Sequence, residues 1–169
     1  MTEGPNLNDK ENKMLRILLF VLTHLIAFAI GIGLAVFFLP IITAEDSPDE
    51  AVLEESAQEA LFTGEFDRDL EGSDLGHWGE GTISVTPTQI VHQGRLSPGP
   101  DYKLYLVPEF VETEEEFLPI KSSAQRIGDV KSFNGLILDV PPDVDIDEFN
   151  TVLIWCEAFS QFITAAKYK

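Results

Sequence analysis

Thr151-Val152-Leu153-Ile154-Trp155-Cys156 is the stretch of sequence that decides the fold of this chain. All of its side chains except that of Thr151 are apolar, and they show none of the polar alternation that is typical of a half-exposed strand. A short apolar run of this kind predicts a β-strand that is covered on both faces. We therefore expect residues 151–156 to lie at the centre of a sheet.

Similar short runs lie before and after this stretch, and Gly, Pro, Asp and Asn separate them. This pattern predicts an all-β domain over residues 65–169, with an antiparallel sandwich or barrel-like architecture. Turns are predicted at residues 97–100 and 141–143, and a charged loop or single helical turn at 112–117. The expected strands are Gly81–Val85, Gln89–Gln93, Lys103–Val107, Gly135–Val140, Thr151–Phe159 and Phe162–Tyr168.

An uncharged run of 28 residues, Ile17–Ala44, lies near the N-terminus. A helix over residues 17–39 would span about 34 Å, which is enough to cross the hydrocarbon of a bilayer. The alternative is a cleaved signal peptide, because Ile42-Thr43-Ala44 resembles a cleavage site. The run exceeds the apolar region of about 7–15 residues in a signal peptide, so we expect a retained signal-anchor helix over residues 17–42.

The charges that flank this helix predict its orientation. Lys10, Lys13 and Arg16 precede it, and acidic residues follow it from Glu45 onward. By the positive-inside rule, residues 1–16 form a cytoplasmic tail and the C-terminal domain is periplasmic or otherwise extracytoplasmic. The chain has no Asn-x-Ser/Thr acceptor, which is compatible with a bacterial periplasm. We therefore expect a single-pass protein of the cell inner membrane.

Residues 43–64 are predicted to form an acidic stalk that is partly helical. Ser47-Pro48-Asp49-Glu50 has the form of a helix start, although a disordered linker is the alternative because of the high charge. The entire net charge of −18 lies after residue 44. This acidity argues against nucleic acid and against a second contact with an anionic membrane surface, and leaves a basic partner or a cation open.

Small residues within the helix suggest a partner helix. Ala27, Gly31 and Ala35 recur at four-residue spacing, which predicts a homodimer whose helices approach closely, unless the spacing arose by chance. His24 is a candidate functional group at membrane depth, and the alternative is that it bonds to a backbone carbonyl.

The residues that could perform chemistry are few. No phosphate-binding glycine loop, HExxH, CxxC, CxxCH or GxSxG motif is present. Cys156 is the only cysteine, so an internal disulfide is excluded. It is either a buried small apolar residue or a redox thiol or ligand for a metal or haem. His77 and His92 are the only histidines of the domain, and nothing in the sequence places either near Cys156.

The C-terminal half resembles the DM13 domain family. The similarity rests on His77 with Gly81, on Gly99-Pro100-Asp101 with Tyr105-Leu106, and on the final run with Ile154-Trp155-Cys156, Phe159 and Ala166. The Trp-Cys pair within this frame is the most specific part. The resemblance implies a β-sandwich module with an electron-transfer role, in which the strand cysteine acts as a free thiol or ligates haem.

Two hypotheses follow. The first is a membrane-tethered redox module for a redox partner protein, in which Cys156 is the reactive or ligating residue and His77 is a second ligand. In this hypothesis Trp155 and Phe159 pack around a pocket that could hold haem, and no metal ion is expected. The second is a non-enzymatic sandwich that binds a protein or small ligand while Cys156 only fills the core. Either module is more consistent with the sequence than a stand-alone enzyme, and architecture alone does not separate the two.

Overall fold

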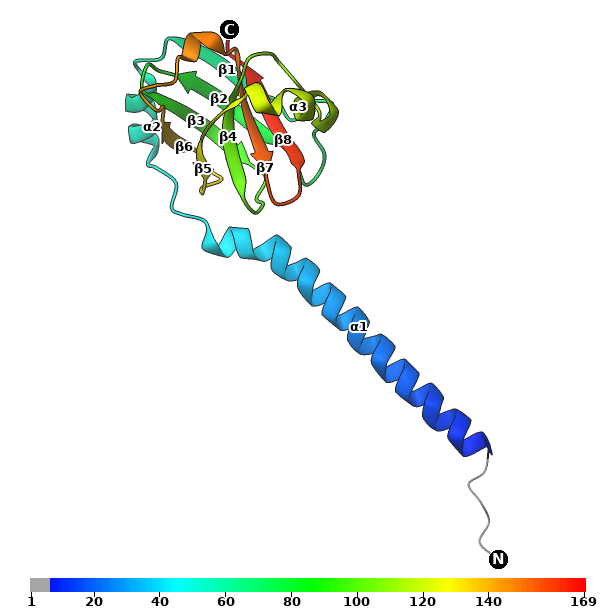
Figure 1. Cartoon of the computed structure of the whole chain (residues 1–169). Helices are drawn as coiled ribbons and strands as arrows, with labels where there is room; N and C mark the ends of the chain where they lie inside the picture. The colour runs from blue at the N-terminus through cyan, green and yellow to red at the C-terminus, as the bar shows by residue number, and fades with distance from the viewer. Residues whose placement is uncertain (1–6) are drawn as a thin grey trace, which may run out of the picture. The chain divides into compact units, whose positions relative to one another are not determined.

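The computed structural model describes residues 7–169, which fall into two compact units (Figure 1). The first unit ends at Leu39 and consists of most of helix α1, Leu7–Thr43. The second unit, Pro40–Lys169, holds every strand.

Helix α1 is the one helix among residues 7–169 that is long and apolar enough to cross a membrane. Its membrane-length part runs from Lys10 to Thr43, and its large apolar side chains are exposed. A helix of this length and composition near the N-terminus is either a membrane anchor or a signal sequence. The Nδ1 atom of His24 lies 2.8 Å from the Phe20 carbonyl oxygen, so the imidazole is bonded to its own helix.

The second unit is a β-sandwich, as the sequence predicts. One sheet has the strand order β1-β2-β3-β6 and the other the order β5-β4-β7-β8, and every pairing is antiparallel. The strands are β1 (Phe62–Phe66), β2 (Gly79–Val85), β3 (Gln89–Leu96), β4 (Tyr102–Val107), β5 (Gln125–Val130), β6 (Leu136–Asp139), β7 (Thr151–Cys156) and β8 (Gln161–Lys167).

The sandwich is not a closed barrel, although two of its edges lie close together. A Cβ atom at Gly64 of β1 would lie 2.7 Å from the carbonyl oxygen of Lys167 of β8, yet no hydrogen-bonded ladder joins these strands among the described residues. Glycine at this position therefore lets the two sheets approach each other. The barrel-like alternative is replaced by two separate four-stranded sheets.

The main core lies between the two sheets. It contains alternate residues of β7, namely Val152, Ile154 and Cys156, which pack with apolar side chains of the facing sheet. The other residues of β7, Leu153 and Trp155, belong to a second cluster on the opposite face of their sheet. This second cluster is covered by helix α3, Glu114–Ile120, whose Phe117 is fully buried. Strand β7 is thus covered on both faces, as its continuous apolar run predicts.

Helix α2, Glu50–Ala57, lies within the segment that the sequence predicts to be a partly helical stalk. The helix begins at Glu50 after Asp49, and Ser47 is not its cap. The segment does not stand apart from the sheets, because Leu53 is buried against Gly135 next to β6. Helix α2 therefore packs on the sandwich through Leu53.

The strands that the sequence misses, β1 and β5, are both edge strands. Each is only partly buried and contains a glycine and charged residues, so neither shows an apolar run. The predicted strand over residues 151–159 ends instead at Cys156, because residues 157–160 form the turn into β8. Short 3-10 turns at Lys121–Ser123 and Ile146–Glu148 complete the elements.

Candidate functional site

Cys156 is the last residue of β7, at one end of the sandwich. It pairs with Tyr102 of β4, and Tyr102 in turn pairs with Val130 of β5. The loops at residues 67–78, 97–101, 131–135 and 157–160 connect strands at this end, which we call the cysteine end. The Cys156 side chain points into the core between the sheets and is only 2% exposed.

The Gly99-Pro100-Asp101 segment holds this cysteine in place. The Cys156 thiol donates a hydrogen bond to the Pro100 carbonyl oxygen at 3.0 Å. The next residue, Glu157, donates its backbone N–H to the Asp101 carbonyl oxygen at 3.1 Å. Asp101 adopts a left-handed backbone with φ 55°, which Asp tolerates better than most residues. The motif therefore fixes the sulfur and the start of the turn that follows it.

Glycine is required at position 99 because of Tyr102. A Cβ atom there would collide with the phenol ring of Tyr102. Burial, opposed by a hydrogen bond with Ser97 and assisted by the charges of Cys156 and Asp74, raises the pKa of Tyr102 to about 12. The phenol therefore stays neutral and packs against Gly99 at the cysteine end.

The electrostatic surroundings keep Cys156 protonated. Burial raises the pKa of the thiol because the low-dielectric core disfavours the thiolate. The backbone amides of Phe159 and Ala158 act in the opposite direction, and the carboxylates of Asp101 and Glu157 raise the pKa again. The net result is a pKa above the ordinary thiol value. A buried thiol with a raised pKa has little thiolate at neutral pH and therefore reacts slowly.

His77 lies in the 67–78 loop at the cysteine end. The next residue, Trp78, makes two hydrogen bonds to Ser97. Its N–H donates to the Ser97 hydroxyl at 3.0 Å, and its carbonyl oxygen accepts from the Ser97 N–H at 2.9 Å. The imidazole of His77 is partly exposed, and its Nδ1 atom is held by the Asp74 carboxylate at 2.9 Å. The loop thus lies at the same end of the domain as Cys156, but the His77 imidazole is bound to Asp74 and makes no contact with the sulfur.

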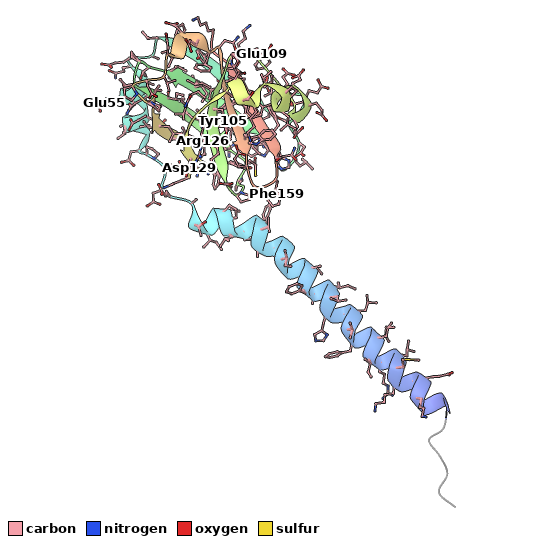
Figure 2. The ribbon with its side chains drawn as sticks, viewed as in Figure 1. Glu55, Tyr105, Glu109, Arg126, Asp129 and Phe159 are labelled. Atoms are coloured by element: carbon pink, nitrogen blue, oxygen red, sulfur yellow. The ribbon has the colours of Figure 1, made fainter. Side chains whose placement is uncertain are left out.

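Trp155 does not share a pocket with Cys156, contrary to expectation. Consecutive side chains of a strand point to opposite faces, so Trp155 packs on Phe117 under α3, with ring centroids 5.0 Å apart. Its Nε1 atom is buried without a hydrogen-bond partner. Phe159 does not line a pocket either, because it lies 60% exposed on the turn at 157–160 (Figure 2).

A polar cluster beside Trp155 was not predicted from the sequence. The Tyr105 hydroxyl donates to one oxygen of Glu157, and Lys121 Nζ lies 2.7 Å from the other. The same ammonium group lies 5.2 Å from the centre of the Trp155 ring. Lys121 and Tyr105 hold the pKa of Glu157 below its usual range even though burial opposes them. The cluster anchors the residue that follows Cys156.

His92, the other histidine of the domain, is fully buried in β3. Its Nε2 atom lies 3.0 Å from the Glu80 carbonyl oxygen, and burial lowers its pKa, so it is a neutral structural residue. No group of three or more His, Cys, Asp or Glu side chains in the described part of the chain is arranged to hold a metal ion.

Comparison with known proteins gives one match. A family model described as "Electron transfer DM13" matches residues 65–168. No curated protein and no solved structure matches the chain.

Proposed function

The chain belongs to the electron-transfer DM13 family, and from this premise we propose that its sandwich is a membrane-tethered redox module whose working atom is the sulfur of Cys156. The observation that carries the proposal is the convergence of the Gly99-Pro100-Asp101 segment on this residue. Pro100 binds the sulfur and Asp101 binds the following turn. Two parts of the family resemblance, the Gly99-Pro100-Asp101 segment and Cys156, therefore meet at one thiol.

The proposed reaction is exchange with a disulfide of a partner protein. Cys156 gives its proton to solvent, and the thiolate forms a bond to one sulfur of the partner. The S–S bond of the partner breaks, and its second sulfur leaves with the electron pair as a thiolate. Cys156 is oxidised and one partner sulfur is reduced, so the electrons balance. Such disulfides persist outside the cytoplasm, which agrees with the proposed extracytoplasmic location.

The geometry does not fit haem ligation by Cys156. The sulfur donates to Pro100 and is packed among core side chains, which leaves no open face for a metal. His77, the expected second ligand, has Nδ1 bound to the Asp74 carboxylate, a contact that would still allow ligation through Nε2. Trp155 lies on the other face of the sheet and cannot cover a ring bound at the sulfur. We therefore propose thiol chemistry and route no step through haem.

The tether is the second part of the proposal. Helix α1 supports an anchor by its length and apolar surface, and the bases before it and acids after it support a cytoplasmic N-terminus. The domain would then face the periplasm or another extracytoplasmic space. Dimerisation through Ala27, Gly31 and Ala35 is proposed as well, because small residues allow two helices to pack closely.

The redox role is tested with glutathione disulfide as the probe. The full chain in detergent is incubated with the probe, and the mass of the intact protein is measured over time. We expect one glutathione adduct on each chain and none on Cys156→Ala. A Cys156→Ala chain that forms the same adduct would overturn the assignment, and so would a native chain that forms none while remaining folded.

The burial of Cys156 specifically favours a second candidate function. A thiol that is 2% exposed and has a raised pKa suits a residue that only fills the core. The domain would then be a binding module that uses its loops. A thiol that reacts with glutathione disulfide only after unfolding would favour this function over the redox role.

A further inference from the structure

Tyr105 differs from the other two tyrosines of the chain in the partner of its hydroxyl group. The Tyr168 hydroxyl donates to a backbone carbonyl oxygen at 2.9 Å, and the Tyr102 hydroxyl is hydrogen-bonded to a serine. The Tyr105 hydroxyl donates instead to the carboxylate of Glu157. A carboxylate is a stronger base than a carbonyl or hydroxyl oxygen. Tyr105 is therefore the tyrosine whose phenol proton already has a basic acceptor within reach.

The charges around Glu157 keep this acceptor ready. Burial opposes ionisation, but Lys121, whose Nζ lies 2.7 Å from the second carboxylate oxygen, and the Tyr105 hydroxyl together hold the pKa of Glu157 below its usual range. Burial and the same carboxylate raise the pKa of Tyr105, so the phenol keeps its proton at neutral pH. An oxidised phenol is a far stronger acid than a carboxylic acid. Loss of an electron from Tyr105 would therefore pass its proton to Glu157 along the existing hydrogen bond.

Trp155 is the competing site of oxidation, and its surroundings oppose that role. Its Nε1 atom is buried without a hydrogen-bond partner among the described residues, so its proton has no acceptor. Lys121 Nζ lies 5.2 Å from the centre of its ring, and an ammonium group at this position disfavours a positive charge on the indole. The Tyr105 ring acquires no net charge, because the electron and the proton leave it together.

Both aromatic residues lie where the strand register of their sheet is irregular. The ladder between β4 and β5 shifts between Leu104 and Tyr105, and the ladder between β7 and β8 shifts between Ile154 and Trp155. Such bulges change the direction of a side chain and are frequent beside functional sites. Phe117 contacts both rings, with centroids 5.7 Å from Tyr105 and 5.0 Å from Trp155. The irregular part of the sheet thus holds the aromatic pair together.

The site reaches the surface of the domain. Tyr105 is 7% exposed, but the side chains of Lys121 and Glu157 that hold it are 28% and 29% exposed. Arg126, labelled near Tyr105 in Figure 2, acts electrostatically on both Tyr105 and Glu157. A redox partner that docks over these charged side chains would exchange electrons with the phenol without entering the core.

We propose that Tyr105 is a one-electron relay, with Glu157 as its proton acceptor, for a metal centre of a partner redox protein. The metal gains one electron, Tyr105 becomes a neutral phenoxyl radical, and Glu157 becomes a neutral carboxylic acid. A one-electron donor then returns the electron, and the proton moves back from Glu157. This activity goes beyond the proposed thiol exchange and does not use the sulfur of Cys156.

The test oxidises the full chain in detergent with ruthenium(III) tris(bipyridine), which is formed by a light flash in the presence of a cobalt(III) ammine quencher. Samples are frozen after the flash, and the tyrosyl radical is measured by electron paramagnetic resonance. Ring-deuterated tyrosine in the chain separates its signal from that of tryptophan. The variants are Tyr105→Phe, the matched control Tyr168→Phe, and Glu157→Gln, which retains the phenol but removes the base. Circular dichroism shows that each variant is folded.

The native chain, Tyr168→Phe and Cys156→Ala are expected to give the same tyrosyl signal, and Tyr105→Phe should lose most of it. Glu157→Gln should form the radical severalfold more slowly, and its yield should depend on the buffer base, which a purely structural role of Glu157 would not cause. A full signal in Tyr105→Phe, or equal rates for Glu157→Gln and the native chain, would overturn the inference. A native chain that forms the glutathione adduct but no tyrosyl radical would also overturn it, while leaving the thiol function in place.

Discussion

The thiol of Cys156 lies 3.0 Å from the Pro100 carbonyl oxygen, although the two residues are 56 positions apart in the chain. This hydrogen bond joins the end of β7 to the loop before β4. It uses the thiol proton, so it exists only while the sulfur is protonated. The contact therefore links the redox state proposed for this domain to its local structure.

The first prediction concerns the reactivity of Cys156 as a function of pH. Burial raises its pKa, so alkylation by iodoacetamide should reach half its maximal rate above the ordinary thiol value of about 8.5. The raised pKa stabilises the folded state below that value, and this stabilisation is lost as the pH rises through the higher folded pKa. Rates are measured by mass spectrometry for the folded chain and in guanidinium. A folded midpoint at or below the unfolded one would contradict the prediction.

The second prediction concerns Asp101, whose carboxylate raises the pKa of Cys156. Asp101→Asn should lower that pKa and speed alkylation at neutral pH, since Asn tolerates the left-handed backbone at this position. The control is Asp129→Asn, because Asp129 binds the same Lys103 from β5. Equal alkylation rates for the two variants would show that the change in reactivity comes from the loss of a partner of Lys103, and not from the loss of the Asp101 charge near the sulfur.

The third prediction concerns Glu157, which accepts from Tyr105 and Lys121. Glu157→Gln should lower the free energy of unfolding by about 1–2 kcal/mol at neutral pH, because an amide cannot accept both charge-assisted bonds. The lowered pKa of Glu157 stabilises the fold above the usual Glu pKa, and this contribution is lost as the pH falls through the folded value. The stabilities of the two proteins from denaturant titrations should therefore begin to approach each other below the usual Glu pKa and converge only below the lowered folded pKa of Glu157. Glu109→Gln, at an exposed loop position, serves as the control and should show no such difference.

The sequence predicts the sandwich well where apolar residues dominate a strand. The continuous apolar run of residues 151–156 predicts strand β7 correctly. The edge strands β1 and β5 are missed because they are half exposed and contain glycine and charged residues. The segment predicted as a partly helical stalk, residues 43–64, contains helix α2. Its docking depends on Leu53 meeting Gly135, which are far apart in the sequence.

The site is predictable only in part. Cys156 is found because it is the only cysteine, yet its partner Pro100 and its burial depend on how the two loops meet in space. The separation of Trp155 from Cys156 could have been predicted, since neighbouring residues of a strand face opposite sides. The cluster of Tyr105, Lys121 and Glu157 could not, because three distant segments supply it.

The fourth prediction concerns the docking of α2. Leu53 is 6% exposed, so Leu53→Ala should lower the free energy of unfolding of the full chain in detergent by about 2–4 kcal/mol. Val52→Ala is the matched control in the same helix, because Val52 is 46% exposed. Its effect should stay within about 0.5 kcal/mol. If the two variants have the same denaturation midpoint, residues 50–57 do not contribute to the fold.

The fifth prediction concerns the proposed helix dimer. Gly31→Leu should reduce the dimer fraction of the full chain in vesicles, because a large side chain prevents the close approach that Ala27 and Ala35 allow on the same face. Gly33 lies about 200° around the helix from Gly31, so Gly33→Leu adds the same side chain on a different face and should leave the dimer intact. The measurement is energy transfer between chains labelled at the N-terminus with donor and acceptor dyes. Equal energy transfer in both variants would contradict the dimer, because a real interface must distinguish the two faces of the helix.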